Sequence, residues 1–294
     1  MRTREAMPQV QFSRIERWAH TALLEEVYTT PKPGLVDLHD NGAHVDMNCA
    51  TFEASAAAIA PYFAQMAWAG WQAELQPESL FAAIRGIGQS AEHAMFRSTG
   101  GINTHKGALF TLGILCAAAG RCLSNCGCIR KDMVLTLGQD MARETLEKEL
   151  RQLRLCIPKT HGELLYQKYG VRGVRGEVID GFPTLRAMDA LLDCFGKTEI
   201  RKNEVKVQAL LVSMARLEDT NVLMRGGPQA AVWVKRTAEE LLEQGGAFSK
   251  QGRAGLREMN RQCIRKNISP GGSADLLAAA LFLRHCQEVW EAGS

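Results

Sequence analysis

A glycine-rich turn near the end of the chain carries residues that could bind a metal-bound nucleotide. It reads Asn267-Ile268-Ser269-Pro270-Gly271-Gly272-Ser273-Ala274-Asp275 and runs into an apolar segment. Paired glycines let a backbone approach a ligand, and Ser273 at a helix N-cap would sit beside amides that can also bind phosphate. Asp275 would repel bare phosphate there, and a bridging Mg²⁺ ion would remove the conflict. The turn therefore predicts a magnesium-nucleotide site, with Ser273 as helix cap, phosphate ligand or both.

A second polar turn lies near the N-terminus and contains a cation, two carboxylates and a histidine. Two prolines and a glycine stiffen and bend its first half, from Thr30 to Asp37. Lys32, Asp37, His44 and Asp46 could converge there. Such a group would supply a cation for phosphate, carboxylates for metal or base work, and a histidine for proton transfer. The alternative is a polar surface loop held by Asx-turns.

A third turn, from Gly100 to Gly107, superficially resembles a phosphate loop. It is not a Walker A motif, because lysine precedes glycine and no strand comes before it. Asn103 or Thr104 can cap the helix that follows, and His105 and Lys106 then lie in its first turn. Extra positive charge at a helix N-terminus costs stability unless an anion binds, so this turn predicts anion binding.

A fourth turn places Arg175 two residues before Glu177 in a glycine-rich run. The planar guanidinium of arginine suits phosphate oxygens, and Glu177 could be a base or a ligand. The alternative is an Arg–Glu surface pair in a flexible loop.

A fifth turn follows an apolar helix and begins with the acidic pair Glu218 and Asp219. Acidic charge is unfavourable at a helix C-terminus, so these carboxylates are candidate metal ligands. Arg225 and the two glycines after it could form an anion nest. The alternative is a solvated helix end.

The elements that must position these turns are helices. Sustained period-two alternation is missing, whereas helical spacing recurs along the chain. We predict an all-α fold of about ten helices in one catalytic domain, residues 12–294, after a disordered leader of residues 1–11, with Pro61 as a kink or boundary. The predicted helices are 12–28, 51–71, 77–96, 105–122, 133–150, 184–195, 204–217, 229–244, 254–266 and 273–290.

Bulk properties restrict the class of partner. The net charge of +3 over 294 residues is too small to argue for nucleic acid. We expect no membrane span, because the apolar runs are shorter than the roughly 20 residues needed, and no secretion signal. Most of the nine cysteines are single residues in apolar surroundings, which favours reduced thiols in the cytoplasm. Cys122, Cys126 and Cys128 lack the spacing of a zinc site and predict a cysteine-rich loop.

The ordered blocks around these turns resemble the triphosphoribosyl-dephospho-coenzyme A synthase family. The resemblance runs from about residue 15 to the end of the chain, and six ordered blocks make it highly specific. The matching blocks are 31–37, 41–47, 103–107, 173–177, 219–227 and 267–277. The Pro-Lys-Pro-Gly and His-Lys-Gly forms are more similar to the citrate lyase branch than to the malonate decarboxylase branch.

The resemblance implies an all-helical enzyme that joins the triphosphoribosyl group of ATP to the 2'-hydroxyl of 3'-dephospho-CoA and releases adenine. A separate transferase would attach the product to an acyl carrier protein of citrate lyase. A malonate decarboxylase pathway, or a Mg²⁺-dependent ADP-ribosyl hydrolase-like enzyme, is the alternative. A non-catalytic helical protein that binds the carrier is a third possibility, and it would consume no ATP.

The implied chemistry assigns a role to each candidate residue. Substitution at the ribose anomeric carbon passes through an oxocarbenium-like state, so the enzyme must hold the triphosphate and move protons. Phosphate ligands would be Lys32, Asn103, His105, Lys106, Arg175, Arg225 and Ser273. Magnesium ligands would be drawn from Asp37, Asp46, Asp219 and Asp275, any one of which could instead be the general base, and His44 and Glu177 are the other proton-transfer candidates.

Overall fold

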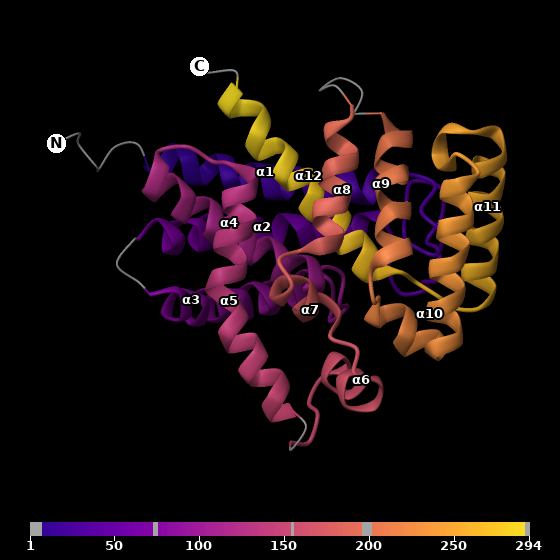
Figure 1. The fold of residues 1–294 in the computed structure, drawn as a ribbon, viewed down its shortest axis with the longest axis horizontal. Coiled ribbons are helices and arrows are strands. Elements are labelled where there is room, and N and C mark those ends of the chain that lie inside the picture. The colour runs from indigo at the N-terminus through magenta and orange to yellow at the C-terminus, as the bar shows by residue number, and fades with distance from the viewer. Residues whose placement is uncertain (1–7, 73–75, 154–155, 196–201, 292–294) are drawn as a thin grey trace.

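The computed structural model describes residues 8–72, 76–153, 156–195 and 202–291. Within these ranges the chain forms twelve α-helices, one short 3₁₀ helix and no strand, which confirms the predicted all-α class (Figure 1). The helices are α1 (Pro8–Tyr28), α2 (Cys49–Trp71), α3 (Pro77–Ser98), α4 (Lys106–Cys126), α5 (Lys131–Leu153), α6 (His161–Tyr169), α7 (Gly173–Ile179), α8 (Pro183–Asp193), α9 (Asn203–Arg216), α10 (Thr220–Glu243), η1 (Gly246–Phe248), α11 (Lys250–Arg265) and α12 (Gly271–Glu291).

Helix α4 is the centre of the core, and it packs against α2, α3, α5 and α12. Helices α4 and α2 cross closely, and glycine is needed at the crossing: a Cβ atom added at Gly120 would lie 1.9 Å from the carbonyl oxygen of Ala67. The same holds for Gly70 and the carbonyl oxygen of Ala117. By length and composition α4 is the one helix of the described ranges that could cross a membrane, but most of it is buried inside the protein.

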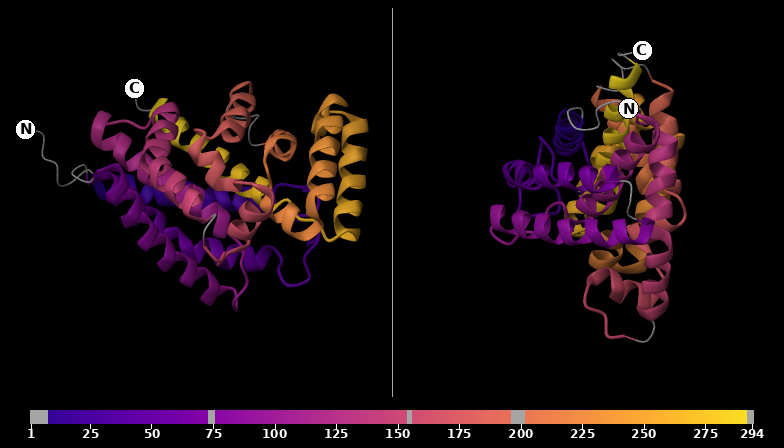
Figure 2. Two further views of the ribbon diagram at one scale, coloured as in Figure 1. Left: turned by 60° about the horizontal axis from the view of Figure 1, so that its bottom comes forward. Right: turned by 90° about the vertical axis from the view of Figure 1, so that its left-hand side faces the viewer.

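Helix α12 connects the two ends of the molecule. Helices α10 and α11 lie side by side at one end, and α12 runs from the base of α11 towards the N-terminal helices (Figures 1 and 2). Along this path α12 packs on α9, α8, α4 and α1. The first turn of α12 is therefore fixed against helices from both halves of the chain.

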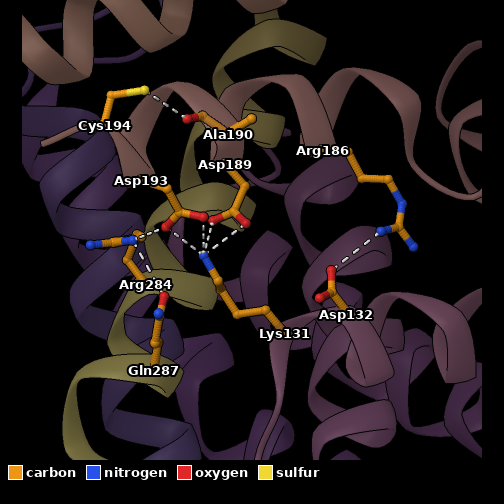
Figure 3. A network of polar contacts seen from close by, with 9 residues as sticks. All are labelled: Lys131, Asp132, Arg186, Asp189, Ala190, Asp193, Cys194, Arg284 and Gln287. Carbon is orange, nitrogen blue, oxygen red and sulfur yellow. Dashed lines mark hydrogen bonds and ion pairs between the residues drawn. The ribbon is translucent and has the colours of Figure 1, made fainter. Parts of the chain in front are cut away.

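An ionic network fixes the distal part of α12 (Figure 3). The Nζ atom of Lys131, at the start of α5, lies 2.9 Å from Asp189 Oδ1 and 2.8 Å from Asp193 Oδ1 on α8. Arg284 on α12 pairs with the same Asp193 carboxylate. Arg284 is about 20 Å along the helix from Gly271, at 1.5 Å per residue. The network thus orients the C-terminal part of α12 and makes no contact with its first turn.

Several predicted boundaries differ from the structure. Helix α1 begins at Pro8, inside the predicted leader, whose residues 1–7 lie outside the described ranges. Pro61 neither ends nor interrupts α2. Helix α7 lies in a segment predicted to be a polar turn, and α6 lies in a stretch for which no helix was predicted. Most of the fifth turn is the start of α10. A non-helical φ of 71° at Gly227 kinks α10 where that turn was predicted to end.

Candidate active site

One cavity of about 830 Å³ collects residues from almost every predicted turn. Its lining comes from the loop after α1, from the segment before α4, and from the starts of α6, α10 and α12. Small-molecule and cofactor sites in proteins commonly enclose about 300 to 1,000 Å³. The predicted site residues that line it are Lys32, His44, Asp46, Asn103, His105, Lys106, Arg175, Arg225 and Asp275.

Four helix N-termini meet at this cavity. First-turn residues of α4, α6, α10 and α12 all belong to its lining, namely Lys106 and Gly107, His161 and Gly162, Thr220 and Asn221, and Gly271 and Gly272. The N-terminus of a helix carries a partial positive charge that attracts anions. At α6 and α10 the side chains of Thr160 and Asp219 already accept hydrogen bonds from first-turn amides, so these two ends contribute mainly through that charge. Convergence of four such ends favours a ligand with several negative charges.

Six cationic side chains add to this positive lining, and five of them have an acidic or carbonyl partner within the protein. Lys106 Nζ lies 2.5 Å from Glu92 Oε1, and Arg175 Nη2 lies 3.5 Å from Glu163 Oε1. The Lys106 side chain is exposed and that of Arg175 is half-buried. Ion pairs near the surface contribute little to stability, so an entering phosphate can replace the carboxylate partner. The six cations are Lys32, Arg85, Lys106, Lys159, Arg175 and Arg225.

Lys32 is the exception, because its pair is buried. The side chain is 2% exposed, and its ammonium group donates to the Glu26 carbonyl oxygen at 2.8 Å and pairs with the Glu26 carboxylate. Burial raises the pKa of Glu26, and Lys32 opposes that rise. Both residues line the cavity. Glu26 was missed from sequence, although it lies four residues after Ala22 on the apolar face of α1.

Asp37, predicted as a catalytic residue or metal ligand, does not line the cavity and instead shapes the loop. Its Oδ2 atom accepts hydrogen bonds from the Lys32 amide at 2.8 Å and from Thr30 Oγ1 at 2.9 Å. Its Oδ1 atom accepts from the amides of His39 at 2.6 Å and Asp40 at 3.1 Å. This carboxylate holds the backbone that presents Lys32, and all its acceptor directions are used within the loop.

His44 and Arg225 are joined at the edge of the cavity. Arg225 Nη2 lies 3.2 Å from His44 Nδ1, and His44 Nε2 lies 2.8 Å from Ser269 Oγ. Arg225 Nη1 also donates to the Asn267 side chain at 2.9 Å. Burial, with Arg225 second, lowers the pKa of His44. The histidine is therefore neutral, with Nδ1 accepting from Arg225 and Nε2 carrying the proton.

His105 differs from the cation expected at this position. It is the N-cap residue of α4 and is 2% exposed. Burial, with the charge of Lys32 second, lowers the pKa of His105 to about 3. The imidazole is therefore neutral, and positive charge at the start of α4 comes from Lys106 alone.

Asp219 and Ser273 interact with each other rather than with the cavity. Ser273 donates to Asp219 Oδ2 from its amide at 2.9 Å and from its hydroxyl at 3.2 Å. Asp219 Oδ1 accepts from the amides of Asn221 at 2.9 Å and Val222 at 3.4 Å, and so caps α10. Ser273 is fully buried inside α12, which begins at Gly271, so the prediction that it caps this helix is wrong. Its predicted role as a phosphate ligand stays a prediction, and the residue does not line the cavity.

Glu177 is likewise occupied outside the cavity. Its carboxylate accepts from the Thr184 amide, at 3.1 Å for Oε2, at the start of α8. Burial raises the pKa of Glu177, which the hydrogen bonds with Thr184 oppose. The side chain thus connects α7 to α8, while Arg175 on the same short helix reaches the cavity.

Asp275 faces the cavity and lies against the start of α4. A Cβ atom added at Gly107 would be 2.0 Å from Asp275 Oδ2, so the two helix ends meet only because residue 107 is glycine. Burial, then the charges of Glu26 and Asp219, raise the pKa of Asp275. Its ionised form is therefore costly without a cation nearby.

The lining fits magnesium bound jointly by protein and phosphate. No group of three or more histidine, cysteine, aspartate or glutamate side chains in the described ranges could hold an ion by itself. Mg²⁺ needs only one or two carboxylates when substrate phosphates supply further oxygens. Asp275 and Asp46 offer such carboxylates in the cavity lining, whereas Asp219 is closed off by its hydrogen bonds.

Together, the helical frame and the cation-lined cavity are typical of a protein with a site for a small polyanion such as a nucleotide. Comparison with known proteins gives the family. Residues 12–294 match the family model for ATP:dephospho-CoA triphosphoribosyl transferase. The chain therefore belongs to this family and is a transferase.

Named relatives support the assignment over most of their length. A Klebsiella pneumoniae protein named 2-(5''-triphosphoribosyl)-3'-dephosphocoenzyme-A synthase is 40% identical over 277 residues, 92% of this chain and 89% of the relative. A Photobacterium profundum protein with the same name, prefixed "probable", is 39% identical over 98% of this chain and 92% of its own. A crystal structure of an Archaeoglobus fulgidus protein superposes with a TM-score of 0.53 at 16% identity, covering 80% of this chain and 98% of that one, which shows a shared fold.

Proposed function

We propose that this enzyme transfers the triphosphoribosyl group of ATP to the 2'-hydroxyl of 3'-dephospho-CoA and releases adenine. The observation that carries the proposal is the meeting of four helix N-termini and six cations at one cavity. ATP and dephospho-CoA together bring a triphosphate and a diphosphate, and both need positive lining. We also infer that residues 12–294 form one catalytic domain, because the first helix, α1, and the last, α12, both contribute to the cavity.

In this proposal Lys32, Lys106, Arg175 and Arg225 bind phosphates, with Asn103 at the start of α4. Lys32 is fixed by Glu26 and Asp37 and acts as a rigid point charge. Lys106 and Arg175 exchange their glutamate partners for phosphate oxygens. Asp275 and Asp46 would hold Mg²⁺, which when bound neutralises phosphate charge.

Proton transfer is assigned to His44, because Asp37, Glu177 and Asp219 do not line the cavity and Asp46 and Asp275 are assigned to Mg²⁺. Its Nδ1 lone pair is occupied by Arg225 at 3.2 Å. When Arg225 turns to a phosphate, that nitrogen becomes free to accept the proton of the incoming 2'-hydroxyl. The hydroxyl oxygen then bonds to the ribose anomeric carbon, the bond to adenine breaks, and adenine leaves with the bonding electron pair and takes up a proton.

Mass spectrometry after incubation with ATP, Mg²⁺ and dephospho-CoA tests the reaction. We expect free adenine and a product whose mass is the sum of dephospho-CoA and the triphosphoribosyl group. Adenine release that does not need dephospho-CoA, with transfer to water, would instead identify an ADP-ribosyl hydrolase-like enzyme. Absence of ATP consumption would exclude both enzymes and favour a carrier-binding protein.

Matched arginine variants on α10 test the phosphate assignment. Arg225→Ala should weaken ATP binding roughly 10- to 100-fold, the range expected for losing hydrogen bonds to a charged group. Arg236→Ala on the same helix is the control, because Arg236 pairs with Glu240 on the surface and does not line the cavity. Equal ATP affinity in the two variants would remove Arg225 from the phosphate site.

We propose that the product serves citrate lyase and that the enzyme works in the cytoplasm. The Pro-Lys-Pro-Gly and His-Lys-Gly blocks support the first proposal, and nine free thiols are compatible with the second. Incubating the product with the carrier subunits of citrate lyase and of malonate decarboxylase, each with its own transferase, tests the pathway. Modification of the malonate decarboxylase carrier alone would contradict the citrate lyase assignment.

A further inference from the structure

A buried nitrogen in the cavity lining has no hydrogen-bond partner among the residues that the structure describes. It is Nε2 of His105, a residue that is 2% exposed and lines the cavity at the start of α4. The ring lies edge-on to Phe52, with centroids 5.0 Å apart at 89°. A buried polar atom without a partner is costly, so its position at a ligand cavity needs an explanation.

The other ring nitrogen is the end of a short hydrogen-bond chain. Thr104 Oγ1 donates to Ser55 Oγ at 2.6 Å, and Ser55 Oγ lies 2.8 Å from His105 Nδ1. Ser55 is fully buried on α2. Because the Ser55 oxygen accepts the Thr104 proton, its own proton is directed to Nδ1. Nδ1 is then the acceptor, and the single proton of a neutral imidazole lies on Nε2.

The neutral state is imposed by the surroundings. Burial, followed by the ammonium group of Lys32, lowers the pKa of His105 to about 3. Nε2 therefore presents a proton without adding a charge beside Lys32. The amides at the α4 N-terminus provide further donors nearby. The acceptor that best suits His105 Nε2, Lys32 and the α4 amides is an oxygen that carries negative charge and no proton.

We propose that Ser55 and Thr104 are positioning residues that hold His105 as a neutral Nε2–H donor to a phosphate oxygen of the bound nucleotide. This inference rests on the proposed function, because that function brings the phosphates into the cavity. It extends that function by giving roles to two hydroxyl groups that do not themselves need to touch the substrate.

Nitrogen-15 NMR of the ligand-free protein tests the tautomer without any reaction. In the wild type we expect one His105 species, protonated at Nε2, with no change in charge state between pH 5 and 8. Ser55→Ala removes the donor to Nδ1 and should give a mixture of tautomers. A wild-type ring protonated at Nδ1, or an unchanged tautomer in Ser55→Ala, would overturn the proposal.

Calorimetric binding of tripolyphosphate, ATP and dephospho-CoA tests the acceptor. His105→Ala and Ser55→Ala should weaken binding of the phosphate chain that His105 contacts roughly 10- to 100-fold, and Thr104→Val roughly 2- to 10-fold. His105→Gln, which keeps an N–H donor, should bind more tightly than His105→Ala. Loss confined to tripolyphosphate and ATP assigns the triphosphate, whereas loss confined to dephospho-CoA assigns its diphosphate.

Ser213→Ala is the matched control for removing a buried hydroxyl. Ser213 on α9 is fully buried, its hydroxyl has no partner, and it does not line the cavity. We expect its phosphate affinities to equal those of the wild type. Unchanged affinity for all three ligands in His105→Ala would overturn the proposal, whereas failure of the wild type to form product would count only against the proposed reaction.

Discussion

Asp219 and Asp275 are two aspartates near the start of α12 that have different roles. Asp219 accepts hydrogen bonds from Asn221, Val222 and Ser273, and its acceptor capacity is spent on joining α10 to α12. Asp275 lies on α12, two residues after Ser273, and faces the cavity. We therefore expect mutation of Asp219 to change mainly the stability of the protein, and mutation of Asp275 to change mainly the kinetics of the reaction.

Replacing Asp219 should affect mainly stability. Asp219→Ala removes an N-cap and leaves the buried Ser273 hydroxyl without its acceptor, at a cost of about 2 to 5 kcal/mol in the free energy of unfolding. Urea denaturation measures this cost. Asp46→Ala, at an exposed position, is the control and should change the unfolding free energy by less than about 0.5 kcal/mol. A stable Asp219→Ala variant without activity would restore the predicted catalytic or metal role.

His105 predicts how stability depends on pH. Its pKa in the folded protein, about 3, is below its usual value near 6.5. The unfolded chain then binds the proton first, so stability is complete above about pH 6.5 and falls as pH decreases towards 3. The loss approaches about 1.4 kcal/mol per pH unit in that window. Denaturation at several pH values should show a shallower slope for His105→Gln, and an equal slope would contradict a neutral His105.

The sequence located the cavity lining better than it assigned individual roles. A cation at a helix N-terminus, such as Lys106, was informative because extra positive charge there is unfavourable unless an anion lies nearby. Aspartate and glutamate next to glycine were ambiguous, because such carboxylates also cap helices and fold loops, as Asp37 and Glu177 do. Residues far apart in sequence that meet only in the fold, such as Ser55 and His105, left no local pattern.

At the scale of helices, the α2–α4 crossing depends on two glycines. Gly120→Ala would place a methyl group 1.9 Å from the Ala67 carbonyl oxygen. Overpacking against backbone cannot be relieved by a side-chain rotation, so we expect a loss of about 3 kcal/mol in unfolding free energy. Gly86→Ala on α3 is the matched control, because nothing lies within 4 Å of its added Cβ.

The control variant should change stability in the opposite direction. Alanine at an exposed helix interior position is better than glycine by about 0.5 to 1 kcal/mol, so Gly86→Ala should raise the thermal midpoint while Gly120→Ala lowers it. If Gly120→Ala were neutral, the close crossing of α2 and α4 would be wrong.

Helical periodicity predicted the ten long helices, because each buries one apolar face. It missed α6 and α7, which are short and rich in glycine and charge. The Thr160–Glu163 spacing is nonetheless a capping-box pattern, and in the structure both hydrogen bonds of that box form. The start of α10 was read as a loop because Gly226, Gly227 and Pro228 follow it closely.

At the scale of the whole molecule, ligand binding should couple the two halves of the chain. The cavity is lined by α1 and α4 on one side and by α10 and α12 on the other. ATP with Mg²⁺ at one hundred times its dissociation constant should raise the unfolding free energy by about 2.7 kcal/mol. Thermal shift measurements with ATP and with adenosine separate the contribution of the triphosphate. Equal shifts for both ligands would contradict a polyanion site.

The convergence of four helix N-termini has a consequence for turnover. In the proposed reaction the bond to adenine breaks, but the triphosphate stays intact on the product. The reaction therefore leaves unchanged the negative charge of the triphosphate, which these helix N-termini attract. We expect the product to leave slowly and to compete with ATP, which steady-state inhibition kinetics would reveal as competitive inhibition against ATP. The turnover rate of this enzyme would then depend on a second enzyme that removes the product.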